Sequence, residues 1–175
     1  MTELEMIEKM LNMQNALNED IIASKHLGSI KKDNLFFALF DELGELTHEL
    51  KHEWCWWKEH QAEVDHDKTL EEYVDVVHFA LTYEIDVLKH SRKEKSKDMI
   101  IQHIEAAHHF ADCKRDLKAI GDSIKEIIKE SYWHPAYLLW EVLSLGFILG
   151  FSMEDIYNEY VAKNKVNFER LESGH

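Results

Sequence analysis

The chain has 175 residues, of which 45% are apolar, and it contains one proline and six glycines. So few helix breakers beside so much apolar content exclude a disordered chain and favour an α-helical domain with a sizeable core. The formal net charge of −14 argues against nucleic acid and anionic membranes as partners, because both would repel the chain, but it allows a small anionic substrate bridged by cations.

The first half of the chain predicts three helices. Apolar residues recur at helical spacing over residues 4–21, which indicates a first amphipathic helix, and a polar loop follows at 28–33. Asp33 is the expected N-cap of a long second helix over residues 34–60. After a polar break, a third helix is expected over residues 70–90.

The middle of the chain is less regular. The run at residues 91–97 is charged, which is typical of a solvated connector. A helical region over residues 99–130 is expected to split near Gly121. Its polar part, residues 108–118, has few apolar anchors, so we expect local mobility there.

The C-terminal part predicts two more helices. One covers about residues 133–151 and is closed by Gly150, because glycine readily adopts the left-handed conformation that ends a helix. Ser152 then begins the last helix, with Asp155 three residues later as the second member of a capping box. No stretch alternates as a β-strand would.

Together these patterns predict a single all-α domain over residues 1–175. Its core helices lie at about 4–90 and 133–171, and a variable, mobile helical region lies at about 91–130. The two cysteines are too few for a disulfide framework, the acidic first ten residues do not resemble a signal peptide, and no run reaches the roughly 18 apolar residues that cross a bilayer. We therefore expect a cytoplasmic protein.

The strongest chemical signal is the acidic run DELGELTHEL in the second predicted helix. Glu42, Glu45 and Glu49 each precede a member of the apolar stripe by one residue, which is about 100° of helix rotation. They therefore line the edge of the buried face, where their mutual repulsion calls for a cation such as Mg²⁺. The alternative is an ordinary acidic helix flank, although Lys51 is the only base nearby.

The third predicted helix carries a matching pair, Glu72 and Asp75. Glu72 has an alternative explanation, since Thr69 to Glu72 fits a capping box. Asp75 does not, because it lies between two valines, where an unpaired carboxylate would be costly. Asp75 therefore needs a cation or strong hydrogen-bond donors.

The last predicted helix places Lys163, Asn167 and Arg170 at i, i+4 and i+7, on one face. A guanidinium, an ammonium and an amide together suit phosphate oxygens. The alternative is a stripe that only aids solubility.

These acidic pairs have the form ExxE and then ExxD (Glu42 and Glu45; Glu72 and Asp75). In this they resemble the all-α nucleoside triphosphate pyrophosphohydrolases, the superfamily of the MazG-like enzymes. Further segments resemble the dimeric dUTPases within it: MQNALN from Met13, the pair Trp57 and Lys58, DVVHF from Asp75, and the ending YVAKN from Tyr160 with Asn167, Arg170 and Gly174. The resemblance extends over residues 13–174.

The resemblance implies a helical bundle of the pyrophosphohydrolase type that acts as a homodimer. Its expected reaction is the Mg²⁺-dependent hydrolysis of dUTP to dUMP and pyrophosphate, with dUDP as a further candidate substrate. Charge accounting requires two or three Mg²⁺ ions per site, or Mn²⁺ as a substitute, held by Glu42, Glu45, Glu72 and Asp75. A metal-activated water would attack the α-phosphate.

The general base for this water is a carboxylate, with Glu45 favoured, then Glu42, and then Glu49. Trp57 would stack on the base, Gln14 would hydrogen-bond its edge, and Phe79 would pack against the sugar. The full set of expected substrate contacts is Gln14, Asn18, Trp57, Lys58, Phe79, Lys163, Asn164, Asn167 and Arg170.

Three alternatives stay open from the sequence. An amide such as Gln14 can rotate to suit cytosine, so a dCTP or broader dNTP pyrophosphohydrolase is the first. The second is a carboxylate-bridged di-iron protein, because acid-x-x-His pairs recur: Glu45 with His48, Glu49 with His52, Asp75 with His78, and Glu105 with His108. The third is a helical interaction module without catalysis.

Overall fold

The computed structural model describes residues 1–90, 93–111 and 115–174, with the backbone alone at 93–96. Over these residues the chain is helical and has no strand, as predicted. The helices are α1 (Glu3–Ser24), α2 (Lys32–Glu49), α3 (Lys51–Trp54), α4 (His66–Lys89), α5 (Lys93–His108), α6 (Leu117–Trp133), the 3-10 turn η1 (Pro135–Tyr137), α7 (Leu138–Leu149) and α8 (Met153–Glu172).

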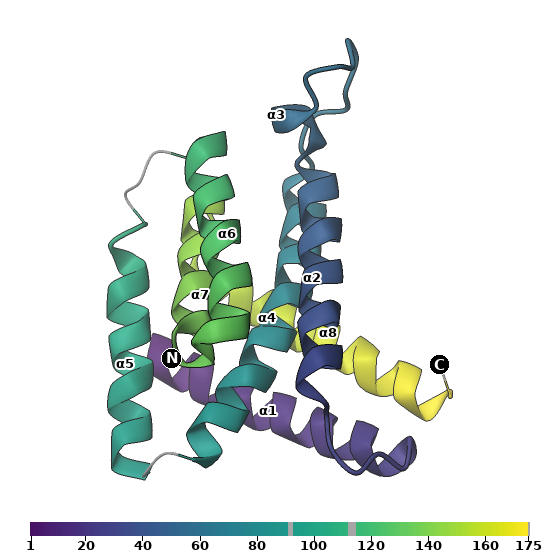
Figure 1. The fold of residues 1–175 in the computed structure, drawn as a ribbon, viewed down its shortest axis with the longest axis vertical. Coiled ribbons are helices and arrows are strands. Elements are labelled where there is room, and N and C mark those ends of the chain that lie inside the picture. The colour runs from purple at the N-terminus through teal and green to yellow at the C-terminus, as the bar shows by residue number, and fades with distance from the viewer. Residues whose placement is uncertain (91–92, 112–114, 175) are drawn as a thin grey trace.

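The helices form a bundle in which α2, α4, α5, α6 and α7 follow the long axis of the molecule (Figure 1). Helices α1 and α8 pack on each other and cross this set at one end. Helices α2 and α4 lie side by side and run in opposite directions, because the segment after α3 turns the chain back (Figure 1). The two acidic helices predicted from the sequence are therefore neighbours.

Helix α4 is the centre of the bundle and packs against α1, α2, α7 and α8. Most of the apolar residues of α4 are buried, and Tyr73 is fully enclosed. The hydroxyl of Tyr73 donates a hydrogen bond to the carbonyl of Val142 at 2.9 Å. Gly146 of α7 faces this ring so closely that a Cβ there would collide with it, so α4 and α7 require glycine at this position.

The predicted boundaries of the last two helices are confirmed where local capping decides them. Gly150 has a φ of 94° and ends α7 in the left-handed conformation. Ser152 and Asp155 form the capping box that begins α8. The predicted start at residue 133 is wrong, because α6 continues to Trp133 and α7 begins only at Leu138, after Pro135.

The second helix is shorter than predicted. It ends at Glu49 and not at residue 60, and a short α3 and an irregular segment follow. The indole Nε1 of Trp54 donates to the carbonyl of Thr47 at 2.7 Å, so the chain folds back over the end of α2. The N-cap is Lys31, while Asp33 lies in the first turn, where its charge suits the helix dipole.

The other boundary corrections also concern caps. Helix α4 begins after Asp65, whose side chain caps two backbone amides, so the polar run at 65–68 starts the helix rather than preceding it. The break in the middle region lies between α5 and α6 and not at Gly121, because Asp116 caps α6 through the amide of Ala119.

Parts of three predictions concern residues that the structure does not describe. The charged connector expected at 91–97 includes residues 91–92, and the rest of it belongs to α5. The mobile stretch expected at 108–118 includes residues 112–114, and its mobility stays a prediction. Cys55 is buried and free, while Cys113 lies outside the described residues.

In the described part of the chain, no helix on its own has both the length and the apolar content needed to cross a membrane. The segments Pro135–Leu149 and Met153–Glu172 reach that threshold only as a pair, and they are bent by 109° relative to each other.

Candidate metal and nucleotide site

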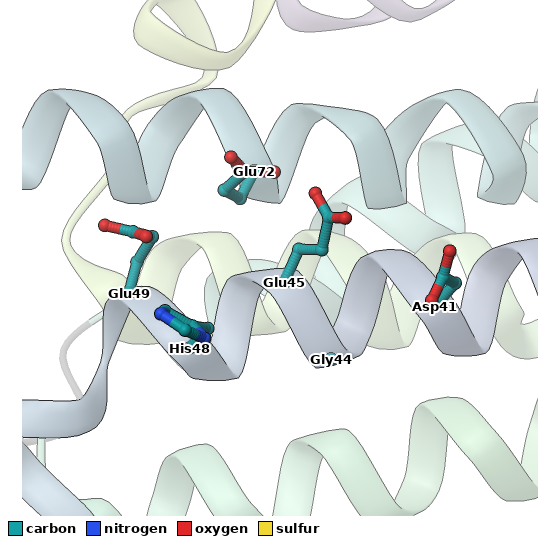
Figure 2. Close-up of a pocket in the computed structure, with 6 residues that line it drawn as sticks. All are labelled: Asp41, Gly44, Glu45, His48, Glu49 and Glu72. Carbon is teal, nitrogen blue, oxygen red and sulfur yellow. The ribbon is translucent and has the colours of Figure 1, made fainter.

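Three carboxylates meet between α2 and α4. Glu42 and Glu45 of α2 and Glu72 of α4 each offer one oxygen, and these oxygens lie within 4.8 Å of one another. Figure 2 shows Glu72 and Glu45 pointing toward each other across the gap, with Glu49 one turn further along α2. The packing of α2 against α4 therefore brings together three of the four metal ligands predicted from the sequence.

An open hollow of about 440 Å³ adjoins these carboxylates. Acidic side chains dominate its lining, and Gly44 leaves space because it has no side chain. The lining residues are Asp41, Gly44, Glu45, His48, Glu49 and Glu72 (Figure 2). Glu49 therefore borders the hollow but is not a member of the three-oxygen group.

Burial and neighbouring carboxylates raise the pKa of two members of this group, Glu42 and Glu72. Burial raises the pKa of Glu42 to about 7, and the charges of Asp75, Glu45 and Glu72 add to this rise. The pKa of Glu72 is also raised, first by burial and then by Glu45 and Asp75. The negative charge of these carboxylates is therefore poorly balanced by positive charge at neutral pH, as is usual for a cation site without its cation.

Asp75, the fourth predicted ligand, is engaged by a lysine. Its Oδ2 lies 2.7 Å from Nζ of Lys163, which also lies 3.1 Å from Oε1 of Glu71. Burial raises the pKa of Asp75, although the hydrogen bond and the charge of Lys163 act against this rise. Glu71 was missed as a site residue, although its i,i+4 spacing from Asp75 indicates a shared face.

The remaining phosphate-binding candidates lie along α8. Asn167 is partly buried and Arg170 is exposed near the end of the helix. The charge of Arg170 still lowers the pKa of Asp75, so this guanidinium lies within electrostatic reach of the cluster. Lys163 of the predicted basic face therefore contacts the carboxylates, and phosphate binding by Asn167 and Arg170 stays a prediction.

A buried hydrogen-bond network joins α1, α4 and α8. Oε1 of Gln14 accepts from Nδ1 of His78 at 2.7 Å and from the hydroxyl of Tyr160 at 2.9 Å. Nε2 of Gln14 donates to Asn18 at 2.9 Å, and Asn18 donates to Thr82 at 3.2 Å. Gln14, which is expected to contact the base, and Asn18, another expected substrate contact, are thus held in place.

Two polar atoms beside this network have no hydrogen-bond partner. They are Nε2 of His78, whose ring stacks on Tyr160 at 4.3 Å, and Nδ2 of Asn164, one turn further along α8. Both side chains are buried, and buried polar atoms usually hydrogen-bond to a protein group, a ligand or water. His78 was missed as a site residue, although it directly precedes Phe79 in the DVVHF segment. Phe79 itself is partly buried against the core.

Trp57 and Lys58 lie in the segment after α3, which projects beyond the end of α2 that is far from α1 (Figure 1). Both are exposed, and Trp57 contacts Trp54 and Trp56 with ring centroids 5.6 and 5.7 Å away. The structure therefore does not bring them together with Gln14, and their contact with the base stays a prediction.

The histidines do not gather as iron ligands among the described residues. The candidate metal group there consists of carboxylates alone. His78 belongs to the Gln14 network, and Nε2 of His108 lies 2.8 Å from Glu3 at the start of α1. His48 interacts with Lys51.

Comparison with known proteins gives the family. A family model described as dUTPase matches residues 6–175. No curated protein matches the chain. The match covers almost the whole sequence, and the helical architecture and the carboxylate cluster agree with it. The chain therefore belongs to the all-α, dimeric type of the dUTPase family and is a nucleotide pyrophosphohydrolase.

Proposed function

We propose that the chain hydrolyses dUTP to dUMP and pyrophosphate with Mg²⁺ held by Glu42, Glu45, Glu72 and Asp75. The observation that carries this proposal is the meeting of three carboxylate oxygens within 4.8 Å of one another, beside an open hollow, in a chain of the dUTPase family. Mg²⁺ fits this donor set, because it prefers carboxylate oxygens and completes its shell with water and phosphate. The raised pKa of Glu42 supports the same assignment.

Bound Mg²⁺ would supply two effects here: it neutralises the phosphate charge and lowers the pKa of a water. Side chains of the protein would accept the proton of the attacking water and bind the phosphates. Glu45 is exposed to the hollow and is best placed to hold the proton of the attacking water, with Glu42 and Glu49 as the next candidates. Lys163 and Arg170 would bind phosphate oxygens, and Asn167 would orient them.

The network at Gln14 offers groups that can hydrogen-bond a pyrimidine base such as uracil. His78 is neutral, because burial, and to a smaller extent the charge of Lys163, lowers its pKa to about 3. The Tyr160 hydroxyl lies nearer to Oε1 of Gln14, at 2.9 Å, than to the carbonyl of Met10, at 3.2 Å. Because Oε1 of Gln14 can only accept, its contact with Nδ1 places the single ring proton of neutral His78 on Nδ1.

This tautomer leaves Nε2 of His78 as an unpaired acceptor, and Nδ2 of Asn164 is an unpaired donor. Uracil carries a donor at N3 next to carbonyl acceptors, and so complements both atoms. Cytosine carries an acceptor at N3 and a donor at its exocyclic N4, so it can meet Nε2 of His78 only through N4, whereas uracil meets it through N3. We favour dUTP over dCTP as the substrate because the chain belongs to the dUTPase family.

An exposed aromatic face on α2 and α6 supports a homodimer. Phe37, Phe40, Tyr132 and Trp133 are 51–68% exposed. Phe36 links three of these rings, with centroid distances of 5.6 Å to Phe37, 6.3 Å to Phe40 and 6.1 Å to Tyr132. Contiguous exposed aromatic surface of this kind marks an interaction site, and we infer that a second copy covers it.

A pyrophosphate-release assay tests the function. The substrates are dUTP, dCTP, dTTP, dATP and dUDP, the last scored by phosphate release, and the conditions are Mg²⁺, Mn²⁺ and EDTA. We expect dUTP to be hydrolysed fastest, with activity in Mg²⁺ or Mn²⁺ and none in EDTA. Faster turnover of dCTP would move the assignment to a dCTP pyrophosphohydrolase. Protein isolated with iron and no phosphohydrolase activity would favour the di-iron alternative.

A further inference from the structure

Lys163 of α8 lies at the edge of the carboxylate cluster, and its side chain is unusually buried for a lysine. Its side chain is only 11% exposed, whereas lysines are almost never buried unless they are paired. The ammonium lies 2.7 Å from Asp75 and 3.1 Å from Glu71, so it joins α8 to two carboxylates of α4. It supplies positive charge to this part of the cluster.

Other lysines of the same region are arranged differently. Lys165, two residues along α8, is 80% exposed and pairs at 3.8 Å with Glu169 of its own helix. The lysine pairs on α6 are likewise exposed and internal to that helix. The contact of Lys163 with Asp75 is thus a specific tertiary interaction and not a general feature of surface lysines.

The ion pair has a consequence for metal binding, which rests on the proposed function. Oδ2 of Asp75 cannot bind a divalent ion while an ammonium lies 2.7 Å away, because the two cations would repel each other at close range. The lysine side chain is long and flexible, so it can leave Asp75 without any shift of α8. The ammonium, once released, is free to bind an anion.

We propose that Lys163 is an internal counter-ion of Asp75. When the metal and the triphosphate bind together, Lys163 releases this carboxylate to the metal and pairs with the triphosphate instead. Lys163 is then a positioning residue that makes metal binding depend on nucleotide binding. The dependence is reciprocal, so the metal must strengthen nucleotide binding by the same factor.

The test is Mn²⁺ binding measured by electron paramagnetic resonance, without nucleotide and with a non-hydrolysable dUTP analogue. The wild-type protein should bind Mn²⁺ weakly alone and more tightly with the analogue. Lys163→Met should bind Mn²⁺ about five- to tenfold more tightly than the wild type without nucleotide, and should gain less from the analogue. Lys163→Gln should behave in the same way, and circular dichroism verifies that each variant is folded.

Two variants separate this role from a general effect of charge. Lys165→Met removes the same charge from the same helix at an exposed position, and should leave Mn²⁺ affinity at the wild-type value. Lys163→Arg keeps the charge and should restore weak binding without nucleotide.

Three results would overturn the inference. The first is wild-type or weaker Mn²⁺ affinity in folded Lys163→Met and Lys163→Gln without nucleotide. The second is equal tightening in Lys165→Met, which would mean that net charge alone is responsible. The third is an absence of Mn²⁺ binding in all variants, even with the analogue, and this result would also overturn the proposed metal site.

Discussion

Replacement of Glu42 by glutamine should stabilise the protein when no metal is bound. The pKa of Glu42 is raised from 4.5 to about 7 by burial and by the neighbouring carboxylates. Between these two values the folded state binds more protons than the unfolded state, so stability falls as pH rises through this window. Above about pH 7 the whole penalty is present, and glutamine, which has no charge, removes it.

The size of this effect follows from the pKa. A rise of the Glu42 pKa from 4.5 to about 7 corresponds to a loss of about 3 kcal/mol in the free energy of unfolding. Solvent screening at this partly exposed position reduces the gain to about 1–2 kcal/mol. For a chain of this length that gain raises the melting temperature by roughly 2–8 °C.

The assay is thermal unfolding in EDTA at pH 8 and at pH 4.5. Glu42→Gln should melt higher than the wild type at pH 8, and the difference should shrink at pH 4.5. With saturating Mg²⁺ at pH 8 the order should reverse, since the variant lacks a metal ligand. Glu63→Gln, an exposed change of the same charge in the segment after α3, is the control. A wild type that is the more stable at pH 8 in EDTA, or a difference that does not depend on pH, would refute the reasoning.

Four further changes test other parts of the site and surface. Glu45→Ala should lower the turnover of dUTP by at least about 100-fold while the fold stays intact by circular dichroism, and near wild-type turnover would remove Glu45 from catalysis. Arg170→Lys should lower kcat/KM for dUTP about tenfold, because the bidentate fork is lost, without weakening the binding of deoxyuridine; equal loss for both ligands would contradict a phosphate contact. His78→Phe should lower kcat/KM for dUTP about tenfold, because Nε2 can no longer accept from N3 of uracil, and an unchanged value would exclude Nε2 of His78 from base binding. Trp133→Lys should shift the protein from dimer to monomer in sedimentation, and an unchanged dimer would place the interface elsewhere.

Some features of this protein follow from the sequence because they depend on neighbours within one or two helical turns. The end of α7 at Gly150 and the box of Ser152 with Asp155 are of this kind. So is the acidic edge of α2, because the spacing of Glu42 and Glu45 fixes their common face in any helix. The family resemblance then predicted the partner pair on α4, and the structure brings Glu72 to it.

Other features depend on contacts between residues far apart in the chain. Trp54 ends α2 early by folding onto Thr47, although its spacing continues the apolar stripe of that helix. Lys163 and Glu71 are 92 residues apart, and only the packing of α8 on α4 decides that this lysine holds Asp75 and Glu71 before any phosphate is bound. The sequence by itself therefore determined the helical class, the caps at Gly150 and Ser152 and the acidic faces. The tertiary structure decided which charges neutralise one another, because helical periodicity orients a side chain without specifying what lies opposite it.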